Sequence, residues 1–266
     1  MGTLDPAKEV QKVIWSLGDY RELSRHGTYG EELVDAVGVA AGMEVLDVAA
    51  GTGKVARAAA ARGAKVIASD LTPAMIEWGR SESAAAGLEI EWMEADAEDL
   101  PFEPGRFDRV LSSFGAQFTP SPDVVAREMF RVTKPGGVVG MANWTADGYM
   151  GQRIIANMRR TPAPDPEAPL RWGDPGYVRE RFEGLADDIR FDRRSARLVF
   201  GSLQEVRDFW ERFNGPQIAL RNILPPEQYE EMLGELNDLT AAHNQADDGS
   251  VRIDSDWLLV VAQKPR

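Results

Sequence analysis

Residues 45–56 read VLDVAAGTGKVA, and this stretch decides the fold. The apolar run Met43–Val48 predicts a buried strand, Ala49–Gly53 predicts a tight turn, and the alanine-rich run Val55–Arg62 predicts a helix. Glycine lets the backbone adopt positive φ and approach a ligand closely, and the start of the following helix offers free N–H groups. The stretch therefore predicts a strand–turn–helix unit that cradles a small ligand.

Apolar runs and helical patterns continue to alternate up to about residue 143. Further strands are predicted at Lys65–Ser69, Glu89–Met93, Asp108–Phe114 and Val138–Asn143. Helices are predicted from Thr72, as the cap residue, to Gly87 and from Ser121 to Thr133, and a turn at Gly136 and Gly137. This alternation predicts βαβ units and a parallel sheet.

The pattern changes after Asn143. Residues 145–190 carry five prolines and few strand-like runs, which predicts a helical or irregular insertion outside the sheet. Within it, Asp174 is expected to cap a helix that Pro175 begins. The rest of the chain predicts a strand, a helix with a capping box, a second helix and a last strand, at 195–200, 202–213, 226–243 and 253–261.

Composition limits the classes of function. The chain has 266 residues, no cysteine and two histidines, which excludes thiolate chemistry and argues against a histidine metal centre; an all-carboxylate site stays open as an alternative, and no metal is expected. The net charge of −13 repels nucleic acid and anionic membranes, so the expected partner is a neutral or cationic small molecule. The first fifteen residues have no secretory pattern, and the chain is expected to be cytoplasmic.

The glycine turn by itself fits two kinds of cofactor. Gly51 and Gly53 also match the dinucleotide fingerprint, and Asp70 lies where either cofactor's ribose would be held. Asp47, at the end of the first strand, would repel a diphosphate and favour the ammonium and sulfonium of S-adenosylmethionine. The acidic run 94–99, which follows the third strand, can accept from the exocyclic amine of adenine.

With these motifs in place, the chain resembles the class I S-adenosylmethionine-dependent methyltransferases. It is most similar to the branch of type 11/25 methyltransferases that resembles ubiquinone and menaquinone biosynthesis enzymes. The resemblance rests on LDVAAGTG, VIASDLTPAMIEWGR, ADAEDLPFEPGRFDRVLSSFGAQF and REMFRVTKPGGVVGMANW, in this order over roughly residues 40–145. It implies a Rossmann-like, doubly wound α/β fold with seven mostly parallel strands, of which WLLVVAQKP is the antiparallel terminal one.

The resemblance also implies the domain organisation and the partners. One methyltransferase domain would span 1–266: an N-terminal helical lid at 1–40, a cofactor-binding core at 41–144, an acceptor-site insertion at 145–194 and the remaining sheet and helices at 195–266. The cofactor would be S-adenosyl-L-methionine, with S-adenosyl-L-homocysteine as product. The acceptor would be a small, partly hydrophobic or aromatic molecule of secondary-metabolite or quinone type. A homodimer is compatible with this organisation.

The family's roles can be carried over to matching positions. The cofactor's methionine part would face Asp47, Ala49, Gly51, Thr52 and Gly53. Its ribose and adenine would be held by Asp70, Leu71, Met75, Asp96, Ala97 and Glu98, with Ser113 and Phe114 under the sulfonium. Many members have glycine where Ala49 stands, so the alanine predicts a position that does not require positive φ.

Other candidates lie outside these motifs. Trp15 and Tyr20 resemble a lid over the cofactor, although plain packing explains them equally well. His26 and Tyr20 are the candidate catalytic residues, and methyl transfer needs a base only when the acceptor must lose a proton. The acceptor is expected to contact Phe118, Trp144, Tyr149 and Trp172. The rival hypotheses are a cofactor-binding relative without activity, an NAD-dependent dehydrogenase and, more weakly, a nucleic-acid methyltransferase.

Overall fold

The computed structural model describes residues 5–266, which form two compact units. The sheet unit comprises Thr28–Thr145, Pro169–Arg194 and Trp257–Arg266. The helical unit comprises the described residues up to Gly27, Ala146–Ala168 and Ser195–Asp256. The chain enters and leaves the sheet unit several times. Each unit therefore combines parts of several of the four consecutive segments predicted from the sequence.

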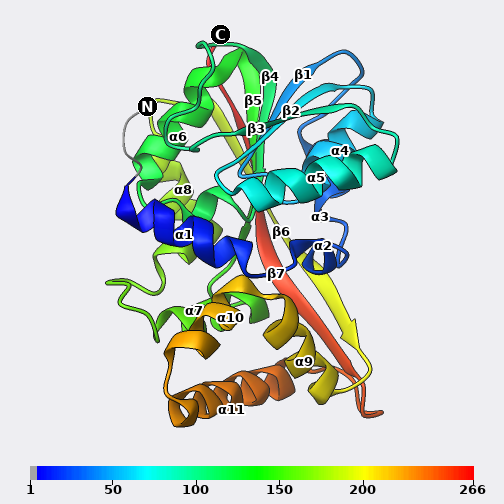
Figure 1. Cartoon of the computed structure of the whole chain (residues 1–266). Helices are drawn as coiled ribbons and strands as arrows, with labels where there is room; N and C mark the ends of the chain where they lie inside the picture. The colour runs from blue at the N-terminus through cyan, green and yellow to red at the C-terminus, as the bar shows by residue number, and fades with distance from the viewer. Residues whose placement is uncertain (1–4) are drawn as a thin grey trace. The chain divides into compact units, whose positions relative to one another are not determined.

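Seven strands form one sheet in the order β3-β2-β1-β4-β5-β7-β6 (Figure 1). Their bounds are β1 Glu44–Val48, β2 Lys65–Asp70, β3 Ile90–Glu94, β4 Phe107–Ser113, β5 Thr133–Trp144, β6 Asp188–Phe200 and β7 Val251–Gln263. β1 to β5 are mutually parallel, and β7 is antiparallel to β5. The predicted Rossmann-like α/β fold with an antiparallel terminal strand is confirmed.

The sheet unit also contains helices. They are α3 Tyr29–Ala36, α4 Lys54–Ala61, α5 Pro73–Ala85, η1 Ala116–Phe118, α6 Pro122–Val132, η2 Ala168–Gly173 and α8 Pro175–Arg181. Of these, α4, α5 and α6 connect successive parallel strands (Figure 1). Leu46, Val110 and Val139, on three neighbouring strands, are fully buried in one hydrophobic cluster together with Met129 and Phe130 of α6. Burial of this apolar surface is the main stabilising contribution to the unit.

The helical unit contains helices from three parts of the chain. They are α1 Pro6–Ser16, α2 Tyr20–Leu23, α7 Tyr149–Met158, α9 Leu203–Phe213, α10 Gly215–Ile223 and α11 Pro226–His243. Ser202 caps α9 by accepting from the Glu205 N–H at 3.1 Å. Two apolar clusters hold these helices, one around Trp210 and Phe200 and one around Met232.

Two strand boundaries correct the sequence predictions. β6 begins at Asp188 rather than at 195, because Ile189 and Phe191 alternate with charged residues and pack against the sheet unit's core. The alternation includes only these two apolar residues before the charged residues 192–194 interrupt it, so the strand signal in the sequence is weak. β5 begins at Thr133 and includes the predicted turn at Gly136, whose positive φ of 72° falls in a region where the pairing with β4 shifts its register.

Helix caps follow the sequence in one case and differ in another. Asp174 accepts from the Tyr177 N–H at 2.8 Å and Pro175 begins α8, as predicted. Thr72 is the cap residue of α5, but its side chain makes no capping hydrogen bond. The Asp70 carboxylate instead accepts from the Thr72 N–H at 2.8 Å.

Candidate functional site

The turn between β1 and α4 combines three residues with left-handed backbone. Ala49, Gly51 and Gly53 have φ of 51°, 56° and 78°. The prediction that this position does not require positive φ is wrong, since Ala49 itself adopts it. A Cβ on Gly115 would approach the Ala49 carbonyl oxygen to 2.3 Å, so the turn after β4 packs directly against Ala49 and holds it in this conformation.

The two glycines of the turn differ in what surrounds them. A Cβ on Gly53 would lie 2.4 Å from Trp92 Cη2, so this glycine is required by packing. A Cβ on Gly51 would meet nothing within 4 Å. The backbone at Gly51 therefore faces open space, as a cradle for a ligand requires.

Asp47 is the last acid of β1 and is 1% exposed. Its Oδ2 accepts from the Ala56 N–H in the first turn of α4 at 2.9 Å. Its Oδ1 has no hydrogen-bond partner among the described residues. Burial raises the pKa of this carboxyl to about 8, and the nearby Asp70 charge adds to the shift. A cation placed at Oδ1 would favour the ionised form.

Asp70 ends β2 and joins the glycine turn to α5. One oxygen accepts from the Gly51 N–H and the other from the Thr72 N–H, both at 2.8 Å. Burial raises its pKa, although these hydrogen bonds oppose the shift. Each carboxylate oxygen can accept a second hydrogen bond, so Asp70 retains capacity for a ligand hydroxyl.

The residues predicted to read adenine follow β3. The Asp96 backbone bridges to Asp99, and its side chain accepts from the Glu98 N–H at 2.9 Å. Ala97 is 8% exposed, and the Glu98 carboxylate accepts from the Ser121 N–H at 2.6 Å. These contacts make a fixed loop next to the end of β2, where Met75 is buried and Leu71 half-buried.

Aromatic side chains cluster beyond the ends of β4 and β5. Phe114 stacks on Trp144 with ring centroids 3.8 Å apart and an interplanar angle of 7°. Phe114 also contacts Tyr29 and Trp257 edge-on, at 4.9 and 6.1 Å. The backbone φ of Phe114 is 55°, a left-handed value. Its side chain therefore does not continue the alternation of β4, which ends at Ser113.

Three buried hydrogen-bond donors flank Trp144 without acceptors among the described residues: Gln117 Nε2, Asn143 Nδ2 and Trp257 Nε1. Gln117 accepts from the Trp144 N–H at 3.0 Å, Asn143 precedes Trp144 on β5, and Trp257 pairs with Trp144 across the strands. Gln117 Nε2 and Trp257 Nε1 are thus donors close to Trp144, whereas Asn143, its neighbour on the strand, is directed to the other face of the sheet.

Tyr29 and Lys54 are site neighbours that sequence reasoning missed. The Lys54 ammonium lies 4.3 Å from the centroid of the Tyr29 ring, and burial raises the pKa of Tyr29. Their only sequence signal is position, since Lys54 follows Gly53 directly and Tyr29 begins the helix before β1.

The remaining predicted residues are distributed between the two units. In the sheet unit, Phe118 is half-buried in η1, while Trp172 is 1% exposed and packs against Phe182 and Tyr177 in the core. In the helical unit, Tyr149 is fully buried and lies 3.0 Å from the Thr240 hydroxyl. The contacts of Trp172 and Tyr149 are those of packed interior residues, and their acceptor role stays a prediction.

The lid and base candidates all belong to the helical unit. Trp15 contacts Tyr20 edge-on at 5.7 Å, and His26 contacts Phe209 edge-on at 5.3 Å. Aromatic packing therefore accounts for these positions, and their roles at the cofactor or in catalysis stay predictions.

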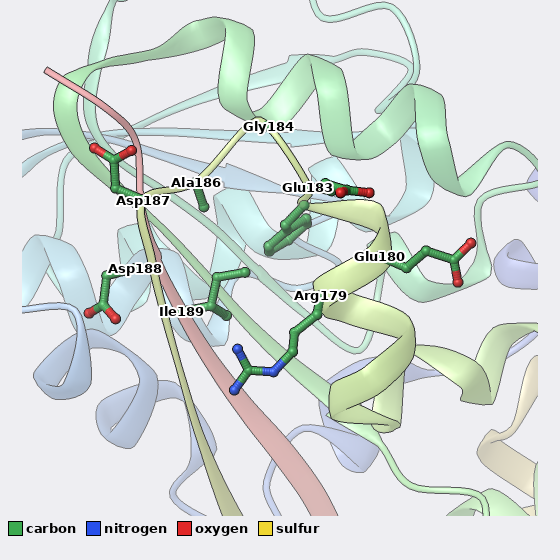
Figure 2. Close-up of a pocket in the computed structure, with 9 residues that line it drawn as sticks. Arg179, Glu180, Glu183, Gly184, Ala186, Asp187, Asp188 and Ile189 are labelled. Carbon is green, nitrogen blue, oxygen red and sulfur yellow. The ribbon is translucent and has the colours of Figure 1, made fainter.

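A hollow of about 540 Å³ lies elsewhere on the sheet unit, between α8 and the start of β6 (Figure 2). Its rim carries Glu180, Glu183, Asp187 and Asp188, with Arg179 among them. No residue predicted for the site lines it. Within residues 5–266, no cluster of acids and histidines is arranged to hold a metal ion, and no helix has the length and hydropathy to cross a membrane.

Comparisons with known proteins converge on one family. Residues 45–137 match the Methyltransf_25 model, described as a methyltransferase domain. The chain is 40% identical over 220 residues, 80% of either chain, to the uncharacterized protein Rv1403c of Mycobacterium tuberculosis. It is 36% identical over 161 residues to the demethylmenaquinone methyltransferase of Renibacterium salmoninarum, covering 59% of this chain and 64% of that one.

The fold is similar to that of a solved enzyme. Haemonchus contortus phosphoethanolamine N-methyltransferase 2, solved with S-adenosylhomocysteine, superposes with a TM-score of 0.57 and 19% identity. The match covers 90% of this chain and 52% of that chain. The glycine turn and both buried acids, Asp47 and Asp70, lie within the segment that the family model matches.

Proposed function

Since the chain belongs to the class I S-adenosylmethionine-dependent methyltransferases, we propose that it methylates an O, N or C atom of a small, partly hydrophobic, aromatic molecule. S-adenosylmethionine is the methyl donor, and its sulfonium supplies an activated methyl group when it is bound. The observation that carries the assignment of the site is the buried, unpartnered Oδ1 of Asp47 beside the open backbone of Gly51.

The residues at the strand ends fit this cofactor. Asp47 would pair with the ammonium of the methionine part, and the turn Gly51–Gly53 would lie along it. Asp70 would accept from ribose hydroxyls while it keeps Gly51 in place. Asp96 and Ala97 would contact adenine from the loop after β3, beside Met75. These roles follow from the charge and position of each group.

The aromatic stack supports the acceptor class. Phe114 and Trp144 present a flat apolar surface at the carboxyl ends of β4 and β5. Ligands of parallel α/β folds bind at these strand ends. Donors on Gln117 and Trp257 would hold an oxygen substituent of the acceptor. Positioning and exclusion of water can supply much of the rate acceleration, because the leaving group is already activated. The net charge of −13 argues against a nucleic-acid acceptor.

An NAD-dependent reaction is the rival that the same turn permits. The diphosphate of NAD would lie against the glycine turn, beside two buried carboxyl groups, Asp47 and Asp70, which offer it no positive charge and repel it when they are ionised. The other rival, a relative that binds the cofactor but has no activity, would share this cofactor site. It would differ from the proposed enzyme only in that it methylates no acceptor.

Two measurements test the proposal. Calorimetry of the full chain should give micromolar binding of S-adenosylhomocysteine and none of NAD. Incubation with methyl-labelled S-adenosylmethionine and a panel of phenols, arylamines and quinols should label a panel member, and Trp144→Leu should lower that labelling while leaving S-adenosylhomocysteine affinity unchanged. NAD binding without S-adenosylhomocysteine binding would overturn the site. Labelling confined to nucleic acid would overturn the acceptor class.

A further inference from the structure

A buried arginine of the helical unit has only neutral partners among the described residues. Arg153, on α7, is 5% exposed. Its Nη1 donates to the Tyr149 hydroxyl at 3.3 Å, and its Nη2 donates to Gln217 Oε1 at 3.0 Å. The guanidinium also lies 4.7 Å from the ring centroid of Trp210. A charge removed from water is costly without an opposite charge nearby, so these contacts leave the cation only partly compensated.

The hydrogen bonds beyond Tyr149 end on the backbone. The Thr240 hydroxyl donates to the Leu236 carbonyl at 2.7 Å, so it must accept from the Tyr149 hydroxyl at 3.0 Å. Tyr149 therefore uses its proton on Thr240 and accepts from Arg153. This branch contains no acid.

The second branch reaches an acid only through two neutral groups. Gln217 is hydrogen-bonded to the Tyr229 hydroxyl, which in turn donates to Glu211 Oε1 at 3.1 Å. Glu211 is already paired with Arg207 at 3.0 Å. Glu211 is thus separated from Arg153 by Gln217 and Tyr229 and does not neutralise it.

Two further polar atoms near this arginine lack partners among the described residues. The Trp210 Nε1–H, on the ring that the guanidinium faces, has no acceptor, and Asn157 Oδ1 has no donor. Tyr149, Arg153 and Asn157 follow each other at four-residue intervals, so they share one face of α7. Buried polar groups in native proteins are almost always paired, so the Trp210 N–H marks a place for an additional acceptor; Asn157 Oδ1, itself an acceptor, would stay without a partner.

We infer that Arg153 and Trp210 form a carboxylate-binding site in the helical unit. The guanidinium fork matches the two oxygens of a carboxylate, and the indole N–H supplies a third donor. An entering carboxylate would replace Gln217 Oε1 on Nη2, exchanging a neutral acceptor for a charged one. The ring faces of Trp210 and Tyr149 suit a small organic acid with an aromatic or apolar body. The site stands on contacts within the helical unit and is independent of the methyl-transfer proposal.

Titration calorimetry of the full chain with benzoate and with benzamide, its neutral isostere, tests the site. Benzoate is expected to bind at least tenfold more tightly than benzamide. Arg153→Met should remove this preference, and Trp210→Phe, which keeps an aromatic ring but lacks the N–H, should weaken benzoate severalfold. S-adenosylhomocysteine affinity should be unchanged in both variants, which separates this result from any failure of the cofactor site.

Gln217→Glu provides a second test that does not remove the arginine. It places a carboxylate of nearly the same shape 3.0 Å from Nη2, so the melting temperature should rise and benzoate binding should disappear. Equal affinity of the parent protein for benzoate and benzamide would overturn the inference. So would a Gln217→Glu protein that melts lower than the parent and still binds benzoate.

Discussion

The strand ends of the sheet unit and the interior of the helical unit each bury an ionisable side chain that forms no ion pair with a described residue. In the sheet unit it is the Asp47 carboxylate, and in the helical unit it is the Arg153 guanidinium. Asp47 has one free oxygen next to a glycine backbone that faces open space, whereas Arg153 is enclosed by neutral side chains. The first arrangement is ready for a cation, and the second must exchange an internal partner before it can bind an anion.

The largest effect is expected from closing the glycine turn. Gly53→Ala should destabilise the protein by about 2–4 kcal/mol, because left-handed strain adds to a clash with Trp92. It should also abolish measurable S-adenosylhomocysteine binding. Gly51→Ala is the matched control: it bears the strain alone, so urea unfolding should give a loss of only about 1–2 kcal/mol. Equal losses in the two variants would show that Trp92 does not restrict the turn.

A smaller effect is expected at the end of β2. The two Asp70 oxygens accept from the N–H groups of Gly51 and Thr72, and in Asp70→Asn an amide N–H₂ would face one of these donors. The substitution should therefore lower the free energy of unfolding by about 1–3 kcal/mol. S-adenosylhomocysteine should bind about tenfold more weakly or worse, as measured by calorimetry. Glu94→Gln, at the exposed end of β3, is the control and should change stability by less than about 0.5 kcal/mol. A normal affinity in Asp70→Asn would remove this acid from the cofactor site.

The smallest effect is expected where the sequence prediction about backbone conformation was wrong. Ala49→Gly should stabilise the protein by at most about 1 kcal/mol, since relief of the left-handed strain exceeds the added entropy of the unfolded chain. Thermal unfolding would measure this gain, and Ala50→Gly, a neighbouring position without positive φ, should lose stability instead. Loss of stability in Ala49→Gly would mean that the strain at this position is negligible.

These differences explain which parts of the molecule the sequence could predict. The strand–turn–helix unit and the positions of Asp47 and Asp70 are local features, so apolar periodicity and glycine spacing were sufficient. The left-handed conformation of Ala49 depends on its contact with Gly115, which lies in a distant turn, and alanine carries no signature of it.

The helical unit was harder to predict because its properties arise from packing between distant segments. Arg153 lies in a segment for which the sequence predicts only a helical or irregular insertion, and its burial depends on contacts with α9 and α10. The sequence around Trp172 is equally compatible with a pocket wall and with a core position. Its contacts with Phe182 and Tyr177 are visible only in the folded chain. The first half of β6 has only two apolar residues, followed by the consecutive charged residues 192–194, so its strand signal is weak.

The central claim, that the Asp47 carboxylate receives the cationic methionine part of the cofactor, is tested most directly by the pH dependence of S-adenosylhomocysteine binding. Because the pKa of Asp47 is raised to about 8, the free protein holds this carboxyl protonated at pH 6 and must release the proton to pair with an ammonium. The affinity of the parent protein should therefore rise about tenfold between pH 6 and 7, continue to rise up to pH 8, and level off above it. Asp47→Asn should bind weakly at every pH, and adenosine, which lacks the methionine part, should show no pH dependence with either protein. A flat profile for the parent, together with undiminished affinity in Asp47→Asn, would contradict the claim.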